Sequence, residues 1–268
     1  MMEPFDVLVI GRGCLDSIAV LERFPGENQK APLEFRLMEG GGQGATASCC
    51  VSRLGGRAVY VGKVGDDSEG RFCLERLESF SVDTRYVETV AGGRTPTAYI
   101  FVTRDSGART IIYERNDLPP IILDDSLGDL VRRAPTILLD PETTYMAEAL
   151  KPLKRPETRI VYDCERWRKG ITAMMDIADY FIPSSGFLES KELGLSDLTL
   201  PEKIRRLAQR IQGRMIVTHG EDGAYGLIED RILHVPAPRI TAVDTTGAGD
   251  VFHAAFALAV ARGWDPLE

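Results

Sequence analysis

Apolar runs and amphipathic segments alternate along this chain. Short apolar runs that end near Asp, Pro or Gly predict buried strands; they lie at 7–10, 57–65, 136–140, 159–163, 180–183 and 215–220. Segments with helical spacing lie between several of them, and the clearest are 41–56, 67–82 and 200–213. A last strand is predicted at 240–244, followed by a glycine turn and an apolar helix over 251–263. This alternation predicts an α/β domain with a mostly parallel sheet covered on both faces.

Two segments interrupt the alternation. Residues 95–114 show the alternating pattern of two strands around Asp105–Gly107, which predicts a β-hairpin. Residues 18–38 are also strand-like, with a Pro25–Gly26 break. We expect the two pieces to pair into a small sheet outside the main one.

The glycine turn is the most informative short segment of the chain. Gly247, Ala248 and Gly249 let backbone N–H groups converge without interference from large side chains, and the following helix adds its positive N-terminal field. This combination predicts a site for an anion, most plausibly a phosphoryl group. Asp250 would repel that anion, but on the first helical turn it can accept the proton of an attacking hydroxyl. The alternative is that Asp250 is only a favourable acid at a helix start.

Composition limits the function classes. The 268 residues are 44% hydrophobic with a formal net charge of -8, which suits one large folded domain and argues against nucleic acid as a partner. No apolar run reaches the ~20 residues of a membrane span, so no membrane partner is expected. The five cysteines form no CxxC pair and no signal peptide is recognisable, so we expect a reduced, cytoplasmic protein. The three histidines lack metal-site spacing.

Other phosphate-binding motifs fit less well. Gly62–Lys63 lacks the surrounding residues of a Walker A loop, and the turn at 11–16 has Asp16 where a third glycine belongs. Residues 42–47, GQGATA, do satisfy the dinucleotide pattern, with Asp66 and Asp67 near the distance of a ribose-binding acid. A nicotinamide-dependent oxidoreductase is therefore an alternative interpretation.

Three segments resemble the ribokinase-like, or PfkB, carbohydrate kinases. Residues 40–70 resemble the first signature of that family, 244–259 resemble the second, and 216–226 are similar to the nucleotide-binding strand and loop between them. The resemblance implies a single Rossmann-like α/β/α domain over 1–268, with a β lid at about 17–38 and 94–114. It also implies that the family's C-terminal helices are missing from this chain.

The resemblance implies phosphorylation of a sugar-type hydroxyl by ATP with Mg²⁺. It makes Asp250 the catalytic base, in contact with the sugar, and Gly247, Ala248 and Gly249 the anion hole. The positions that match sugar contacts, or lie beside them, are Asp16, Gly41, Gly42, Gln43 and Thr46. Those expected at the nucleotide are Thr218, Gly220, Gly223 and Ser184, and Asp244 matches a residue that helps to hold a monovalent cation such as K⁺.

The chain departs from the family pattern at three positions. Thr46 stands where many members have Asn, and Ser184 and Phe187 stand where many have the Asn and Glu of a motif that organises Mg²⁺. These departures leave open a non-catalytic sugar- or nucleotide-binding relative. In this family lid strands often pair between subunits, so the resemblance also implies a homodimer through the lid.

The signatures, with His253, lean toward the sulfofructose-kinase and ketohexokinase-like branch of the family. Recognition of a sulfonate calls for a cluster of arginines, yet Glu142 lies near the place where one is expected. Lys30 and Arg109 could meet an anionic group, although each alone is better interpreted as a solvated lid charge. A neutral or singly charged sugar is the expected substrate.

Overall fold

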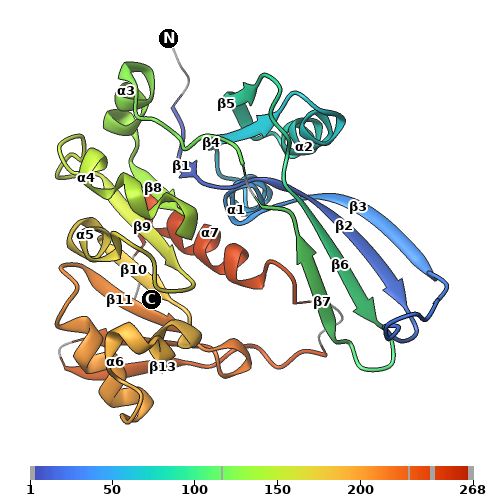
Figure 1. Ribbon diagram of the computed structural model, residues 1–268. Coiled ribbons are helices and arrows are strands. Elements are labelled where there is room, and N and C mark those ends of the chain that lie inside the picture. Colours follow the sequence, from blue (N-terminus) through green and yellow to red (C-terminus); the bar gives the residue numbers. More distant parts are fainter. Residues whose placement is uncertain (1–3, 116, 229, 242–244, 265–268) are drawn as a thin grey trace.

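The computed structural model describes residues 4–115, 117–228, 230–241 and 245–264 (Figure 1). Within these residues the chain forms a main sheet and a smaller second sheet. The main sheet has nine strands in the order β13 (Arg231–Val235), β12 (Ala224–Ile228), β11 (Arg214–Thr218), β10 (Tyr180–Pro183), β9 (Arg159–Cys164), β8 (Thr136–Leu139), β1 (Val7–Ile10), β4 (Ala58–Gly65) and β5 (Asp83–Val90).

The strands from β5 to β11 are parallel, and β12 and β13 add an antiparallel hairpin at one edge. The mostly parallel α/β sheet expected from the sequence is confirmed. The strand predicted at 240–244 is not: Ile240 and Thr241 lie in irregular backbone, and 242–244 fall outside the described residues. Strands β5, β12 and β13 were not predicted. None of their described residues is fully buried, so they lack the continuous apolar run that marks a buried strand.

Helices cover both faces of the main sheet (Figure 1). Leu8 and Ile10 of β1 pack with one helical layer, and Val7 and Val9 pack with the other, because successive side chains of a strand point to opposite faces. The first layer contains α3 (Asp125–Arg133), α4 (Ala147–Leu150), α5 (Ile171–Ile177) and α6 (Leu200–Ala208). The second contains α1 (Gln43–Arg53), α2 (Ser68–Ser79) and α7 (Ala248–Ala261).

Short 3₁₀ helices follow several strands: Pro141–Met146, Ser185–Glu189, Lys191–Leu193 and Gly220–Asp222. None of the helices in the described part of the chain is long and apolar enough to cross a membrane.

The second sheet has the strand order β3 (Phe35–Gly41), β2 (Cys14–Leu21), β6 (Thr97–Thr103) and β7 (Arg109–Tyr113). Strands β6 and β7 form the predicted hairpin, and β2 pairs with β3 on one side and with β6 on the other. The two β pieces that interrupt the alternation therefore do pair with each other. Figure 1 shows this sheet projecting to one side of the main domain.

We expect Leu8→Ala to lower the free energy of unfolding by about 2–5 kcal/mol, because it leaves a cavity at a fully buried position of the central strand β1. Urea denaturation measures the change. Leu33→Ala is the matched control: Leu33 is 53% exposed in a loop, and its loss should cost less than about 0.5 kcal/mol. Equal effects of the two substitutions would contradict this assignment of the core.

Candidate active site

Three acids gather at the carboxyl edge of the main sheet. Asp140 directly follows β8, Asp163 lies near the end of β9, and Asp250 lies in the first turn of α7. With His253 they line one small cavity that also touches the start of α1. Sequence analysis identified Asp250 but missed Asp140 and Asp163. The available signal was that each of these two ends an apolar run, at the edge where the parallel strands of such a sheet collect ligands.

Burial raises the pKa of Asp140, Asp163 and Asp250, each to about 7. For Asp250, the negative charge of Asp163 raises the pKa further, and His253 lowers it. These carboxyl groups therefore change protonation near neutral pH, the range that suits a proton-transfer group.

His253 is buried beside these three acids and lies closest to Asp163. Its Nδ1 lies 2.7 Å from the carbonyl oxygen of Gly249 and 3.5 Å from a carboxylate oxygen of Asp163, and its Nε2 lies 3.3 Å from the carbonyl oxygen of Ile182. Burial lowers the pKa of His253, whereas the two carbonyl groups and Asp250 raise it. Both ring nitrogens face oxygens of the protein, so the ring is not a free metal ligand. No His, Cys, Asp and Glu cluster suited to a metal occurs among the described residues.

The glycine turn lies against the start of α1. Gly247 caps α7 with a φ of 75°, a left-handed conformation that favours glycine. The N–H groups of Gly249 and Asp250 have no hydrogen-bond partner within the described part of the chain. A Cβ atom added to Gly247 would come within 3.3 Å of Thr46, so the N-terminal turns of α1 and α7 are close neighbours. The predicted placement of Asp250 on the first turn of a helix is confirmed.

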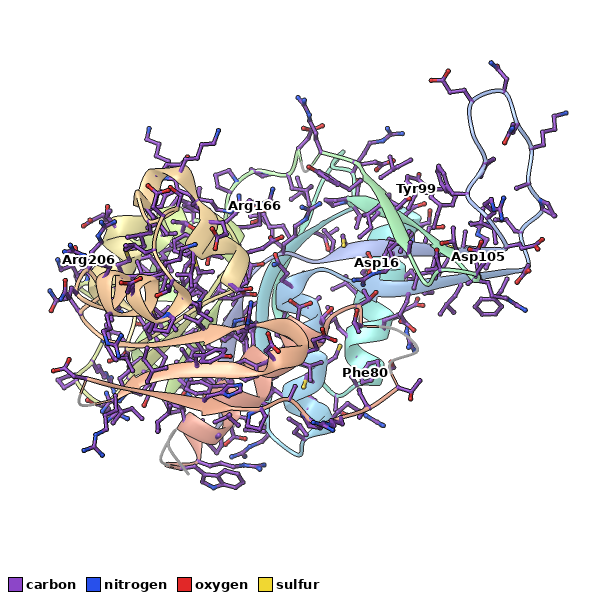
Figure 2. All side chains as sticks on the ribbon, turned by 90° about the horizontal axis from the view of Figure 1, so that it is seen from below. Asp16, Phe80, Tyr99, Asp105, Arg166 and Arg206 are labelled. Carbon is purple, nitrogen blue, oxygen red and sulfur yellow. The ribbon has the colours of Figure 1, made fainter. Side chains whose placement is uncertain are left out.

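Asp16 reaches the site from the second sheet. It lies on β2 opposite Glu39. In Figure 2 Asp16 lies nearer to the main domain than Asp105, which marks the far turn of the hairpin. A Cβ atom at Gly41 would overlap the Asp16 carboxylate, so this carboxylate requires glycine beside it. The charge of Asp16 makes the smallest contribution to the raised pKa of Asp250, after burial and the nearer charges, so the two carboxylates interact electrostatically. Gln43, at the start of α1, lines the same cavity as Asp250, and Gly42 precedes it.

The residues expected at the nucleotide lie further along the same edge. Thr218 ends β11 and pairs with Ser184, which follows β10. Gly220 and Gly223 bound the next tight turn, in which the His219 N–H donates to the Gly223 carbonyl at 2.7 Å. The remaining candidate, Asp244, lies outside the described residues.

Two further residues near the candidate site, Arg109 and Phe187, make contacts that limit their roles. Arg109 of β7 donates a hydrogen bond to Thr246 Oγ1 at 2.6 Å, so the second sheet touches the glycine turn directly. Arg109 is therefore more than the solvated charge expected from the sequence. Phe187 is fully buried and packs against Trp167 and Phe181, so its position supplies no ligand to a metal.

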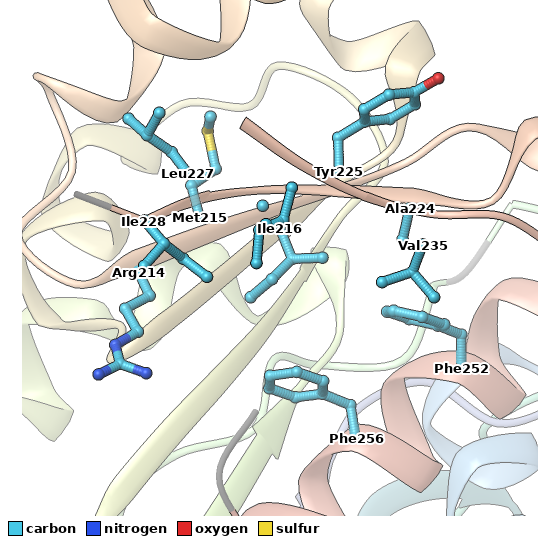
Figure 3. A pocket seen from close by; sticks show the side chains of 12 residues that line it. Arg214, Met215, Ile216, Ala224, Tyr225, Leu227, Ile228, Val235, Phe252 and Phe256 are labelled. Carbon is cyan, nitrogen blue, oxygen red and sulfur yellow. The ribbon is translucent and has the colours of Figure 1, made fainter. Parts of the chain in front are cut away.

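A separate apolar cavity of about 290 Å³ lies between α7 and the strands β11 to β13 (Figure 3). Phe252 and Phe256 of α7 form one wall, and the side chains of Ile216, Ile228 and Val235 face them from the strands. None of the site residues predicted from the sequence lines this cavity.

The chain is similar in sequence and in structure to known proteins. A family model described as pfkB family carbohydrate kinase matches residues 5–268. A ribokinase of Lactococcus lactis is 31% identical over 94% of this chain and 82% of its own length. A deoxyribokinase of Salmonella typhimurium is 29% identical over 94% and 84%. The structure of Arabidopsis thaliana ribokinase with ribose and ATP is similar with a TM-score of 0.81 and 25% identity, over 98% of this chain and 88% of that one.

We expect Asp250→Asn to stabilise the protein at pH 8 by about 1–3 kcal/mol. The native pKa of about 7 lies above the ordinary value of 3.8, so the native state binds more protons than the unfolded state between those values, and wild-type stability falls as pH rises. The advantage of the Asn variant should therefore disappear toward pH 4. Urea denaturation across this range measures it, with Asp129→Asn at an exposed position of α3 as control; a pH-independent difference would contradict the assignment.

Proposed function

Because this chain belongs to the pfkB family of carbohydrate kinases, we propose that it transfers the γ-phosphoryl group of ATP to a hydroxyl group of a sugar. The single observation that supports this most is the position of Asp250. Asp250 lies in the first turn of α7, beside backbone N–H groups that have no partner among the described residues, and it lines a cavity with Gln43 and Asp163.

In this proposal Asp250 is the general base. It accepts the proton of the sugar hydroxyl as that oxygen attacks phosphorus, and it must be ionised to do so. Gly247, Ala248 and Gly249 form the anion hole, where N–H groups and the helix N-terminus stabilise charge on the transferred phosphoryl group.

Asp16, Gly41 and Gly42, with Gln43 and Thr46 beside them, would bind the sugar hydroxyls, because a carboxylate and amide groups can pair with hydroxyl donors and acceptors. The second sheet, with segments 17–38 and 94–114, would act as the lid that excludes water from the reacting phosphoryl group. The hydrogen bond from Arg109 to Thr246 supports this role, since it joins the sheet to the glycine turn.

ATP would lie along Thr218, Gly220, Gly223 and Ser184, at the carboxyl ends of β10 and β11. Mg²⁺ would neutralise phosphate charge there. With Phe187 buried, the carboxylates of Glu165 and Asp163 would hold this ion, because Mg²⁺ prefers oxygen ligands and Glu165 is exposed near Ser184. K⁺ bound with the help of Asp244 remains part of the proposal.

The nicotinamide interpretation gains no support from the geometry. The GQGATA segment follows β3 of the second sheet rather than a strand of the main sheet. Asp67 caps α2 and accepts two hydrogen bonds from Thr95, and Asp66 accepts one from Gly92 N–H, so both acids are engaged in local structure. Turnover separates a kinase from a binding-only relative.

We expect Asp250→Asn to lower kcat by about 10²–10⁴-fold, because the attacking hydroxyl loses its base. ADP release is measured across a panel of pentoses, hexoses and ketoses with Mg²⁺ and K⁺ present. In the wild type kcat/KM should fall about tenfold per pH unit below about 7, since protonation of a group with a pKa of about 7 removes the base.

Asp129→Asn, far from the site, is the control for this experiment and should retain full activity. ATP binding is followed separately by thermal shift. Retained turnover in Asp250→Asn would refute its role as base, and absence of ATP binding in the wild type would refute the kinase proposal.

We also propose that the protein forms a homodimer through the second sheet. Exposed apolar side chains gather on it, including Phe35 and Leu37 of β3 and Ile111, Ile112 and Tyr113 of edge strand β7. Apolar clusters of this kind on a sheet with open edges mark association surfaces.

Ile112→Lys should halve the molar mass measured by light scattering at micromolar concentration, because it places a charge on the apolar edge strand. Ile122→Lys is the matched control, since Ile122 is 73% exposed and lies outside both sheets. A wild type that is already monomeric would contradict the proposal.

A further inference from the structure

A second polar cavity lies beside the proposed sugar site. Its volume is about 280 Å³, and it opens at the carboxyl ends of β1 and β4. Segment 118–121 closes one side, and the 3₁₀ helix Pro141–Met146 closes another. The charged residues that line it are Arg12, Lys63 and Glu142.

Two of these three charges are already paired. Lys63 Nζ lies 2.7 Å from a carboxylate oxygen of Glu88, and Glu142 lies 2.7 Å from Arg168 Nη2. Arg12 differs from both. Within the described part of the chain the Arg12 guanidinium has no hydrogen bond or ion pair. Its Nε is buried from solvent and has no hydrogen-bond partner there.

The backbone holds Arg12 firmly in this position. Its N–H donates to the Asp140 carboxylate, and its carbonyl oxygen accepts from the N–H groups of Gly44 and Ala45 at 3.1 and 3.2 Å. Arg12 is thus fixed between β1, β8 and the start of α1. Arg12 is partly exposed, but its Nε is buried without a partner among the described residues. Because an unpaired buried donor costs about 1–3 kcal/mol, this N–H favours a ligand that offers it an acceptor.

Arg12 lies next to the proposed sugar site, because a Cβ atom added to Gly42 would come within 2.6 Å of the Arg12 carbonyl oxygen. Its positive charge lowers the pKa of Asp16 and of Cys14, against the effect of burial on both groups. Asp16 is the carboxylate that we assign to the sugar hydroxyls, so a ligand bound there lies within electrostatic reach of Arg12.

Resting on the kinase function proposed above, we propose that Arg12 selects a sugar acid, whose carboxylate pairs with the guanidinium while Asp16 binds its hydroxyl groups. An arginine presents N–H donors in a planar fork that matches a carboxylate. One unpaired cation balances a monoanion such as a sugar carboxylate. A phosphate dianion would keep an excess negative charge, because the other cation that lines this cavity is already paired.

The test compares kcat/KM for aldonates, uronates and keto-sugar acids with that for the corresponding neutral sugars and sugar phosphates, in the wild type, Arg12→Met and Arg12→Lys. The wild type should prefer a sugar acid. Arg12→Met should lower kcat/KM for that acid by about 10- to 100-fold, the range for a charged hydrogen bond, and at least tenfold more than for its neutral counterpart. Arg12→Lys should restore part of the preference.

Arg132→Met, at an exposed position of α3, is the matched control and should leave the preference unchanged. A wild type that prefers neutral sugars or sugar phosphates would overturn the inference while leaving the kinase function intact. Thermal shift with the sugar acids alone gives a second readout that does not depend on turnover. Stabilisation of the wild type but not of Arg12→Met supports the inference, and no stabilisation by any sugar acid contradicts it.

Discussion

The site depends on the burial of β1, β8 and β9, neighbouring parallel strands that end at one edge of the main sheet. Their ends bring Arg12, Asp140 and Asp163 to the N-terminal turns of α1 and α7. Burial disfavours ionised carboxyl groups, so the acids at this edge acquire raised pKa values. The same packing that stabilises the fold therefore sets the protonation of the site.

The glycine turn and the second sheet act on this edge from opposite sides. In the proposed reaction the turn would present N–H groups to the charge that develops on a phosphoryl group, and Arg109 of the second sheet contacts this turn at Thr246. A small sheet joined to a rigid domain can move without disturbing the core of that domain. This arrangement suits a reaction that must exclude water and still admit two substrates.

The proposed preference for a sugar acid rests on the charges that line the cavity beside the site. Two of these three charges have a partner, since Glu142 pairs with Arg168 and Lys63 with Glu88. The third, Arg12, has none within the described residues, and hydrogen bonds hold its backbone in place. The leaning toward a sulfofructose-kinase and ketohexokinase-like branch, made from sequence motifs, stays a prediction.

The sequence by itself determined the fold class, the small second sheet and the helical position of Asp250, because apolar periodicity and glycine turns are local signals. It missed Asp140, Asp163 and the unpaired state of Arg12, because Arg12 lies more than a hundred residues before the two acids and meets them only when β1, β8 and β9 pair. It also placed a strand at 240–244, where the described part is irregular, because an apolar run does not show whether a partner strand is available. Local patterns determine elements, but pairing partners and charge balance are properties of the packed structure.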